Sequence, residues 1–141
     1  MFDSLLQATE IGMRRGKYIR RLDGKLRFRN ICIPIGFQTD LDSVPRVPII
    51  FWLWGDRAHR EAVLHDYLYR INSRPVVTRW MADSYFREAI IVTQMEKDPE
   101  SWIRTQFVAW GMWLGVRIGG WSSYHKMRVE DELIPYIDPV Q

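Results

Sequence analysis

The chain has 141 residues, enough for one domain with its own hydrophobic core, and we predict a single domain over residues 1–141. Apolar residues make up 47% and charged residues 26%, values typical of a globular protein, which excludes wholesale disorder. The net charge is +3, but the basic residues are scattered and no zinc-finger spacing accompanies them. We therefore predict no specific nucleic-acid binding. The single cysteine, Cys32, excludes an internal disulfide and a multi-cysteine zinc site.

Two features of the sequence bear on membranes. The first residues lack a basic segment before an apolar run, so we expect no secretory signal. The most apolar window, Phe107 to Val116, spans ten residues between two arginines, which is too short to cross a bilayer. The sequence therefore predicts no transmembrane segment.

Residues 1–50 have the character of strands. The turn residues Asp23 and Gly24 separate two alternating runs and predict a β-hairpin. Ile31, Ile33 and Ile35 alternate and predict a third strand that ends at Gly36. The prolines in residues 39–48 predict a loop after it.

Residues 56–120 have the character of helices, and residues 121–141 are expected to form a surface tail. The first helix is predicted from about Arg57 to Ile71 with Asp56 as its N-cap, and the second from about Arg79 to Glu96. The third is predicted to begin with Asp98 as N-cap. The predicted fold class is α+β, with an N-terminal antiparallel hairpin or small sheet packed on a bundle of about three helices.

The third helix is rich in glycine and tryptophan. Gly111, Gly115 and Gly119 recur every four residues, so they form one stripe of small side chains along which another element packs closely. That element is either a helix of the same core or an oligomer or lipid contact. Seven tryptophans are many for a chain of this length, and we expect some of them to face a partner, either another protein or a second copy.

The predicted first two helices carry the residues best suited to chemistry. His65 and Asp66 lie on either side of a stripe of alanines that allows the next helix to approach closely. If the two helices are antiparallel, Asp83 lies beside His65 and fixes its tautomer, which leaves one ring nitrogen free to act as a base. Asp66 is then free to hold a cation, and the loop GFQTDLDSVP is the only oxygen-rich segment that can complete a calcium site.

The same residues have a purely structural interpretation. Asp66 with Arg70, and Asp83 with Arg87, are spaced as ion pairs on an exposed helix surface. The aspartates and serine of the loop can equally close turns by bonding to backbone amides. Both interpretations stay open on the sequence alone.

The runs GFQTDLDSVPR, AVLHDYLY and ADSYFREAI resemble, in this order, the motifs of a family of small proteins encoded by tailed bacteriophages and prophages. That family is classed as a domain of unknown function, and the resemblance covers about Ile31 to Ile91. It implies a phage origin, with the protein in the host cytoplasm during infection or in the virion.

HDYLY and ADSYF are also similar to the H-D-x-x-Y and A-D-x-x-F helices of phospholipases that cleave the sn-2 ester, including the form found in parvovirus capsids. This resemblance implies that His65 activates water, Asp83 orients His65 and Tyr69 supports the pair, while Asp66 ligates calcium. Those enzymes have a glycine-rich calcium loop where this chain has TDLDSVP. We therefore expect calcium or zinc to involve loop residues as well: Asp40 as a ligand, and Thr39 and Ser43 as supporting residues.

Two functions follow as expectations. The first is a phage-encoded accessory or virion-associated hydrolase of the esterase or phospholipase type, acting on a lipid or another part of the cell envelope. The alternative is a non-catalytic component of the tail or head-to-tail region, in which the polar motif is a buried structural network. Its partners are other virion proteins, or a second copy bound through the tryptophan-rich helix.

Overall fold

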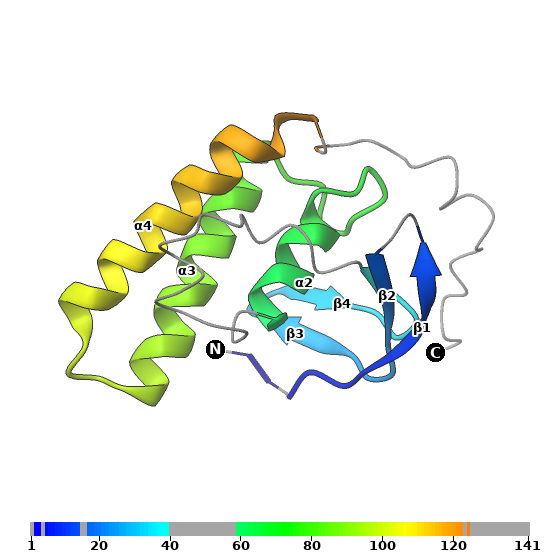
Figure 1. Cartoon of the computed structure of the whole chain (residues 1–141), viewed down its shortest axis with the longest axis horizontal. Helices are drawn as coiled ribbons and strands as arrows, with labels where there is room; N and C mark the ends of the chain where they lie inside the picture. The colour runs from blue at the N-terminus through cyan, green and yellow to red at the C-terminus, as the bar shows by residue number, and fades with distance from the viewer. Residues whose placement is uncertain (1, 4, 15–16, 40–58, 123, 125–141) are drawn as a thin grey trace.

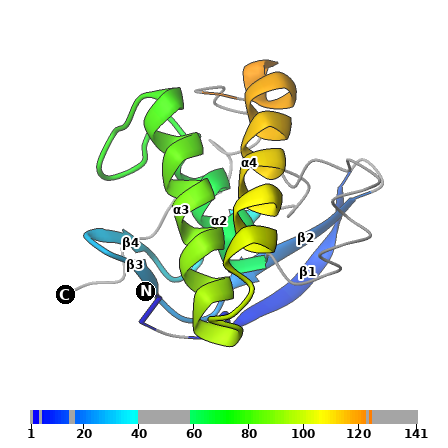
Figure 2. The ribbon, with the colours of Figure 1, turned by 90° about the vertical axis from the view of Figure 1, so that its left-hand side faces the viewer.

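The computed structural model describes residues 2–3, 5–14, 17–39, 59–122 and 124. Its elements form successive layers: the strands, then helix α2 (His59–Leu68), then α3 (Arg79–Lys97), and on the outside α4 (Trp102–Gly119). Figures 1 and 2 show α2 between the strands and the α3–α4 pair. A short 3-10 helix, η1 (Gly120–Ser122), continues α4. The predicted α+β class and its arrangement are confirmed.

The strands form two small antiparallel sheets. In the first, β2 (Lys17–Leu22) lies between β1 (Ala8–Arg14) and β5 (Gln38–Thr39). In the second, β3 (Leu26–Phe28) pairs with β4 (Ile31–Ile33). Both strands of the second sheet bury alternate residues, as expected when only one face meets the core.

Two details of the strand prediction are wrong. Asp23 and Gly24 do not close a hairpin, because β2 pairs with β1 and β5 while β3 pairs with β4. The turn instead carries the chain from one sheet to the other, since both edges of β2 are already occupied. The third predicted strand ends at Ile33 rather than at Gly36, because Pro34 has no N–H to donate to a ladder.

The helices follow their sequence signals with one exception. Helix α3 has the predicted bounds to within one residue, and the Thr78 hydroxyl caps it by accepting the Met81 N–H at 3.3 Å. Helix α2 ends at Leu68, three residues before the predicted end, and its predicted cap Asp56 lies outside the described residues. Helix α4 begins at Trp102 with Ser101 as N-cap, because Asp98 is instead the C-cap of α3.

Two apolar clusters hold these layers together. The larger joins the strands to α2 and includes Phe28, Ile33 and Leu64. The smaller joins α3 to α4: Phe86, Ile90, Val108, Ala109, Met112 and Val116. Within the described part of the chain, no helix is long and apolar enough to span a membrane.

The last glycine of the α4 stripe lacks the close packing that the sequence predicted. A Cβ added at Gly119 would meet no atom within 4 Å, so none of the described elements packs closely on that position. The close approach is at Gly120, where a Cβ would lie 2.6 Å from the Tyr69 hydroxyl oxygen. Gly120 therefore allows the end of α4 to approach Tyr69, which belongs to the candidate site.

Candidate functional site

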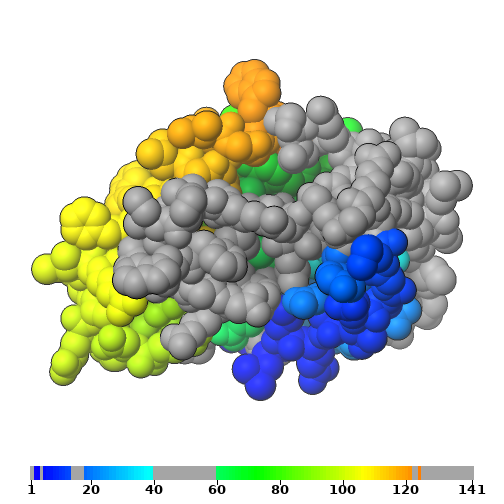
Figure 3. All heavy atoms as spheres, in the orientation of Figure 1, coloured from blue at the N-terminus to red at the C-terminus, as the bar shows by residue number. Residues whose placement is uncertain are grey.

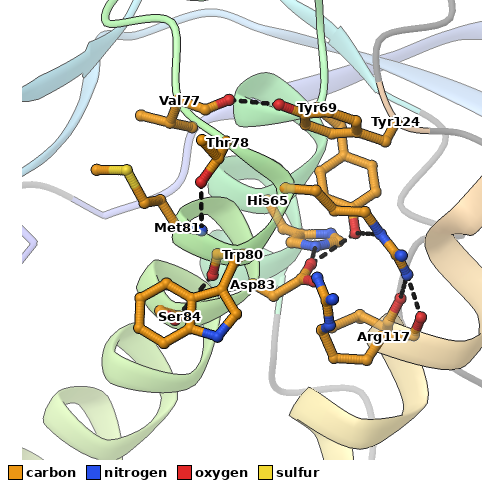
Figure 4. Close-up of polar contacts among 12 residues, drawn as sticks. His65, Tyr69, Val77, Thr78, Trp80, Met81, Asp83, Ser84, Arg117 and Tyr124 are labelled. Carbon is orange, nitrogen blue, oxygen red and sulfur yellow. Dashed lines mark hydrogen bonds and ion pairs between the residues drawn. The ribbon is translucent and has the colours of Figure 1, made fainter.

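The contact that defines the candidate site is made between α2 and α3. His65 lies on the face of α2 that meets α3, and Asp83 lies in the first turns of α3. His65 Nε2 is 2.9 Å from Asp83 Oδ1, and their side chains are only 2% and 0% exposed. Figure 4 shows the two side chains meeting inside the molecule. The structure thus brings together the two residues that the helical spacing paired.

Asp83 accepts two further hydrogen bonds. The Tyr69 hydroxyl donates to Oδ1 at 2.5 Å, and Arg117 Nη1 donates to Oδ2 at 2.9 Å. Burial alone would raise the pKa of Asp83, but the hydrogen bonds from His65, Tyr69 and Arg117 outweigh it and hold the pKa below its ordinary value. Asp83 is therefore ionised at neutral pH and joins α2, α3 and α4 through one carboxylate.

Tyr69 stays a donor in this network. Burial first, and then its hydrogen bond to Asp83, raise the pKa of the Tyr69 phenol far above its ordinary value. Arg79 Nε lies 3.4 Å from the Tyr69 hydroxyl oxygen and also donates to the backbone carbonyls of Val116 and Arg117. Arg79 thus places a positive charge at the C-terminal end of α4, where the helix dipole favours a cation.

The second ring nitrogen of His65 is the unusual atom of the site. Because the ionised Asp83 needs a donor, Nε2 carries the proton and Nδ1 carries a lone pair. Nδ1 is buried and has no hydrogen-bond partner among the residues that the structure describes. The imidazole packs against the rings of Tyr69 and Phe86, with centroids 4.0 and 4.9 Å away. The ring is therefore oriented by Asp83 on one side, while its buried lone pair on the other side meets no donor among the described residues.

Glu61 adds a second buried polar group on the same face of α2, one turn before His65. It is 1% exposed, and among the described residues neither of its carboxylate oxygens reaches the geometry of a full hydrogen bond. Burial raises the pKa of Glu61 above its ordinary value of 4.5. The buried Thr93 hydroxyl of α3 is close enough to oppose this rise in pKa, although the pair does not reach full hydrogen-bond geometry. The α2–α3 boundary thus contains several unsatisfied polar atoms, which folded proteins normally avoid.

The residues predicted to bind a cation are only partly described. Asp66 is 8% exposed, and one of its carboxylate oxygens accepts a hydrogen bond from the Thr39 hydroxyl. This contact ties α2 to β5. Asp40 and Ser43 lie outside the described residues. Among the residues that the structure describes, no group of three or more His, Cys, Asp or Glu side chains could hold a metal ion. One carboxylate and one hydroxyl fall well short of the six to eight oxygens that calcium takes.

Sequence reasoning overlooked three residues of the site: Arg79, Arg117 and Glu61. Arg117 did carry a signal, because it is one of two charged residues in an otherwise apolar helix. A cation in such a helix needs an acidic partner when it is partly buried. Glu61 gave no comparable signal, because a glutamate in the first turn of a helix is ordinary.

Asp83 does not form the exposed ion pair with Arg87 that the structural interpretation predicts. Asp83 bonds to His65 and Arg117 instead of Arg87, whose guanidinium lies 4.2 Å from the centre of the Trp110 ring. The arrangement can therefore do one of two things. It can hold a histidine as a base, or it can fasten three helices together through a buried carboxylate.

Comparisons with known proteins identify the family. No curated protein and no solved structure matched the chain. The family described as "Protein of unknown function (DUF1353)" matches residues 20–116, which is more than half of the chain. The match covers the strands from β2 onward and nearly all of the three helices, including His65, Asp66, Tyr69 and Asp83. The chain therefore belongs to the DUF1353 family of proteins of unknown function.

Proposed function

We propose that this protein is a phage-encoded accessory or virion-associated hydrolase that cleaves a carboxylic ester with His65 as general base. One observation carries the proposal: Asp83 holds His65 Nε2 at 2.9 Å, while the buried Nδ1 has no hydrogen-bond partner in the described part of the chain. A buried base without a partner costs folding free energy, so a role in chemistry would account for its presence.

The proposed reaction uses water as the nucleophile. Nδ1 takes a proton from water as the water oxygen bonds to the ester carbonyl carbon. The C–O bond then breaks, and the imidazolium returns this proton to the departing alkoxide. The ionised Asp83 stabilises the imidazolium through Nε2–H. Tyr69 and Arg117 act as positioning residues, because they hold the two oxygens of that carboxylate.

The test is a comparison of ester hydrolysis by matched histidine variants. General-base catalysis contributes about 10²–10⁴ in rate, so His65→Gln should lower kcat at least about 100-fold. His125→Gln is the matched control, and it should keep its activity. The substrates are nitrophenyl esters of increasing chain length and phospholipid vesicles. No activity in the unaltered protein, or equal activity in His65→Gln, would exclude the proposed role.

A divalent cation is a separate part of the proposal. Asp66 and Asp40 are the proposed ligands, with Thr39 and Ser43 beside them, and calcium or zinc is the proposed ion. Binding at one hundred times the dissociation constant would stabilise the fold by about 2.7 kcal/mol. Millimolar calcium or zinc should therefore raise the melting temperature of the unaltered protein but not that of Asp66→Asn. An unchanged melting temperature would exclude the proposed cation site. The role of His65 would then be tested by the kinetics alone.

A second candidate function is supported by a different observation. Asp83 links three helices, and the outer face of α4 exposes large apolar side chains. These features suit a non-catalytic component of the phage tail or head-to-tail region. Mass spectrometry of purified phage particles distinguishes a virion component from a protein confined to the host cytoplasm.

A further inference from the structure

The outer face of α4 carries a row of large apolar side chains, which we call the outer ridge. Its members are 50–81% exposed: Ile103, Phe107, Trp110, Leu114, Ile118 and Trp121. At 100° per residue the five members on α4 lie within one stripe about 80° wide, and Trp121 follows them in η1. The opposite face of the same helix is buried against α3. Helix α4 is thus apolar on two opposite faces, and among the described elements α3 packs on one of them.

The outer ridge is large enough to form an interface. It extends from residue 103 to residue 121, about 27 Å along the helix axis. Given its exposed fractions and the areas that such side chains can bury, it offers on the order of 800 Å², the area that each partner contributes to a standard protein interface. In Figure 3 the yellow and orange side chains of α4 form the upper left border of the molecule. A contiguous apolar patch of this size marks an interaction site.

We propose that the outer ridge binds the outer ridge of a second copy of this chain. The two α4 helices run antiparallel about a twofold axis at the level of Met112. Members of the ridge follow one another at intervals of three or four residues, as in helices that pair along a seam. The antiparallel arrangement sets Trp110 opposite Leu114 of the second copy, and Ile103 opposite Trp121. Each large ring thus faces a smaller aliphatic side chain, so the ridge is complementary to itself.

The charges of α4 bear on this orientation. Arg104 and Arg117 are its only charged residues. In the antiparallel pair, Arg104 lies about 4.5 Å along the axis from Arg117 of the second copy, whose charge is paired with Asp83 of its own chain. A parallel pair would instead set Arg104 opposite Arg104. The antiparallel orientation thus places Arg104 beside an arginine that already has a counter-ion.

The central ring of the ridge is held in place before association. Arg87 of α3 lies over Trp110, with its guanidinium carbon 4.2 Å from the ring centre. Trp113 meets the same ring edge-on, with centroids 5.4 Å apart. An anchor that is already ordered loses little side-chain entropy on binding, which favours association.

The first test is the oligomeric state of the full chain by sedimentation over a concentration series. We expect the unaltered protein to be a dimer and Leu114→Glu to be a monomer. Its dissociation constant should rise at least about 100-fold, because each dimer contains the change twice. Leu5→Glu is the matched control, since Leu5 is 80% exposed outside the ridge, and it should stay a dimer. A monomeric unaltered protein, or a dimer unaffected by Leu114→Glu, overturns the proposal.

A mixing experiment tests the antiparallel pairing itself. Trp110→Arg and Leu114→Glu should each be monomeric, but an equal mixture should form a heterodimer. In that heterodimer the introduced arginine faces the introduced glutamate, and the other Trp110–Leu114 pair is intact. Failure of the mixture to associate overturns the pairing. A monomer that binds phosphatidylglycerol vesicles through the same ridge would assign the ridge to a lipid surface instead. Neither experiment measures hydrolysis, so its outcome leaves the proposed role of His65 unaffected.

Discussion

Replacing Asp83 with asparagine tests how much stability depends on the carboxylate shared by three helices. Asp83 is fully buried and accepts hydrogen bonds from His65, Tyr69 and Arg117. Asparagine has one carbonyl oxygen, so its NH₂ group must face at least one of these donors. The guanidinium of Arg117 also loses its buried counter-ion.

The expected cost can be estimated from these contacts. Removing one partner of a buried ion pair costs about 3–5 kcal/mol. Because the Arg117 side chain is 29% exposed and keeps some hydration, we expect the lower end, about 3 kcal/mol. For a domain of this size, that corresponds to a fall of roughly 10 °C in melting temperature.

The assay is urea unfolding at pH 7, with Asp23→Asn as the control. Asp23 also accepts a hydroxyl hydrogen bond, from Thr9 at 2.5 Å, and lies near an arginine, but its side chain is 38% exposed. The control should therefore cost less than about 1 kcal/mol. Equal losses in Asp83→Asn and Asp23→Asn would refute the view that Asp83 joins the helices energetically.

The same variant has a defined pH dependence. The pKa of Asp83 is lower in the folded protein than its ordinary value of 3.8, so its ionisation stabilises the fold above that value. This contribution is lost as the pH falls through the folded-state pKa. The difference in stability between the unaltered protein and Asp83→Asn should be constant near neutral pH and shrink below about pH 4. A difference that does not shrink in acid would contradict the view that the ionised carboxylate of Asp83 stabilises the fold.

Three further substitutions test the surroundings of this network. The pKa of Glu61 is raised, so its protonated carboxyl contributes fully to the free energy of unfolding below about pH 4.5. This contribution is lost as the pH rises through the folded-state pKa. Glu61→Gln should therefore be at least as stable as the unaltered protein at pH 7, and this advantage should vanish in acid; a clear loss in thermal melts at pH 7 would mean that the carboxylate has a partner. Gly120→Ala should destabilise by about 1–3 kcal/mol, because its Cβ would clash with the Tyr69 hydroxyl, whereas Gly119→Ala should be neutral or slightly stabilising in the same melts. Tyr69→Phe should cost about 1–2 kcal/mol in urea unfolding through one lost hydrogen bond to Asp83, and a cost near zero would show that this bond is not formed.

Local signals in the sequence determined much of the helical part. The bounds of α3 follow from the turn signals before it and its apolar periodicity, which depend on neighbouring residues only. The pairing of His65 with Asp83 could be predicted because helical spacing puts each on the facing side of its helix, and a short connection returns the second helix beside the first. In both cases the determining contacts lie within about 20 residues of sequence.

Tertiary structure decided what these local patterns leave open. Asp23 and Gly24 mark a change of direction, but which strands pair depends on the edges that distant segments occupy. Arg117 joins Asp83 from 34 residues away, and Glu61 becomes a buried acid beside Thr93 only because α3 packs on α2. The sequence predicted that His65 and Asp83 would meet if the first two helices run antiparallel. Packing of α3 and α4 decided that the pair is buried, that Asp83 is ionised and that one face of α4 stays exposed, because burial and charge depend on every element around a residue.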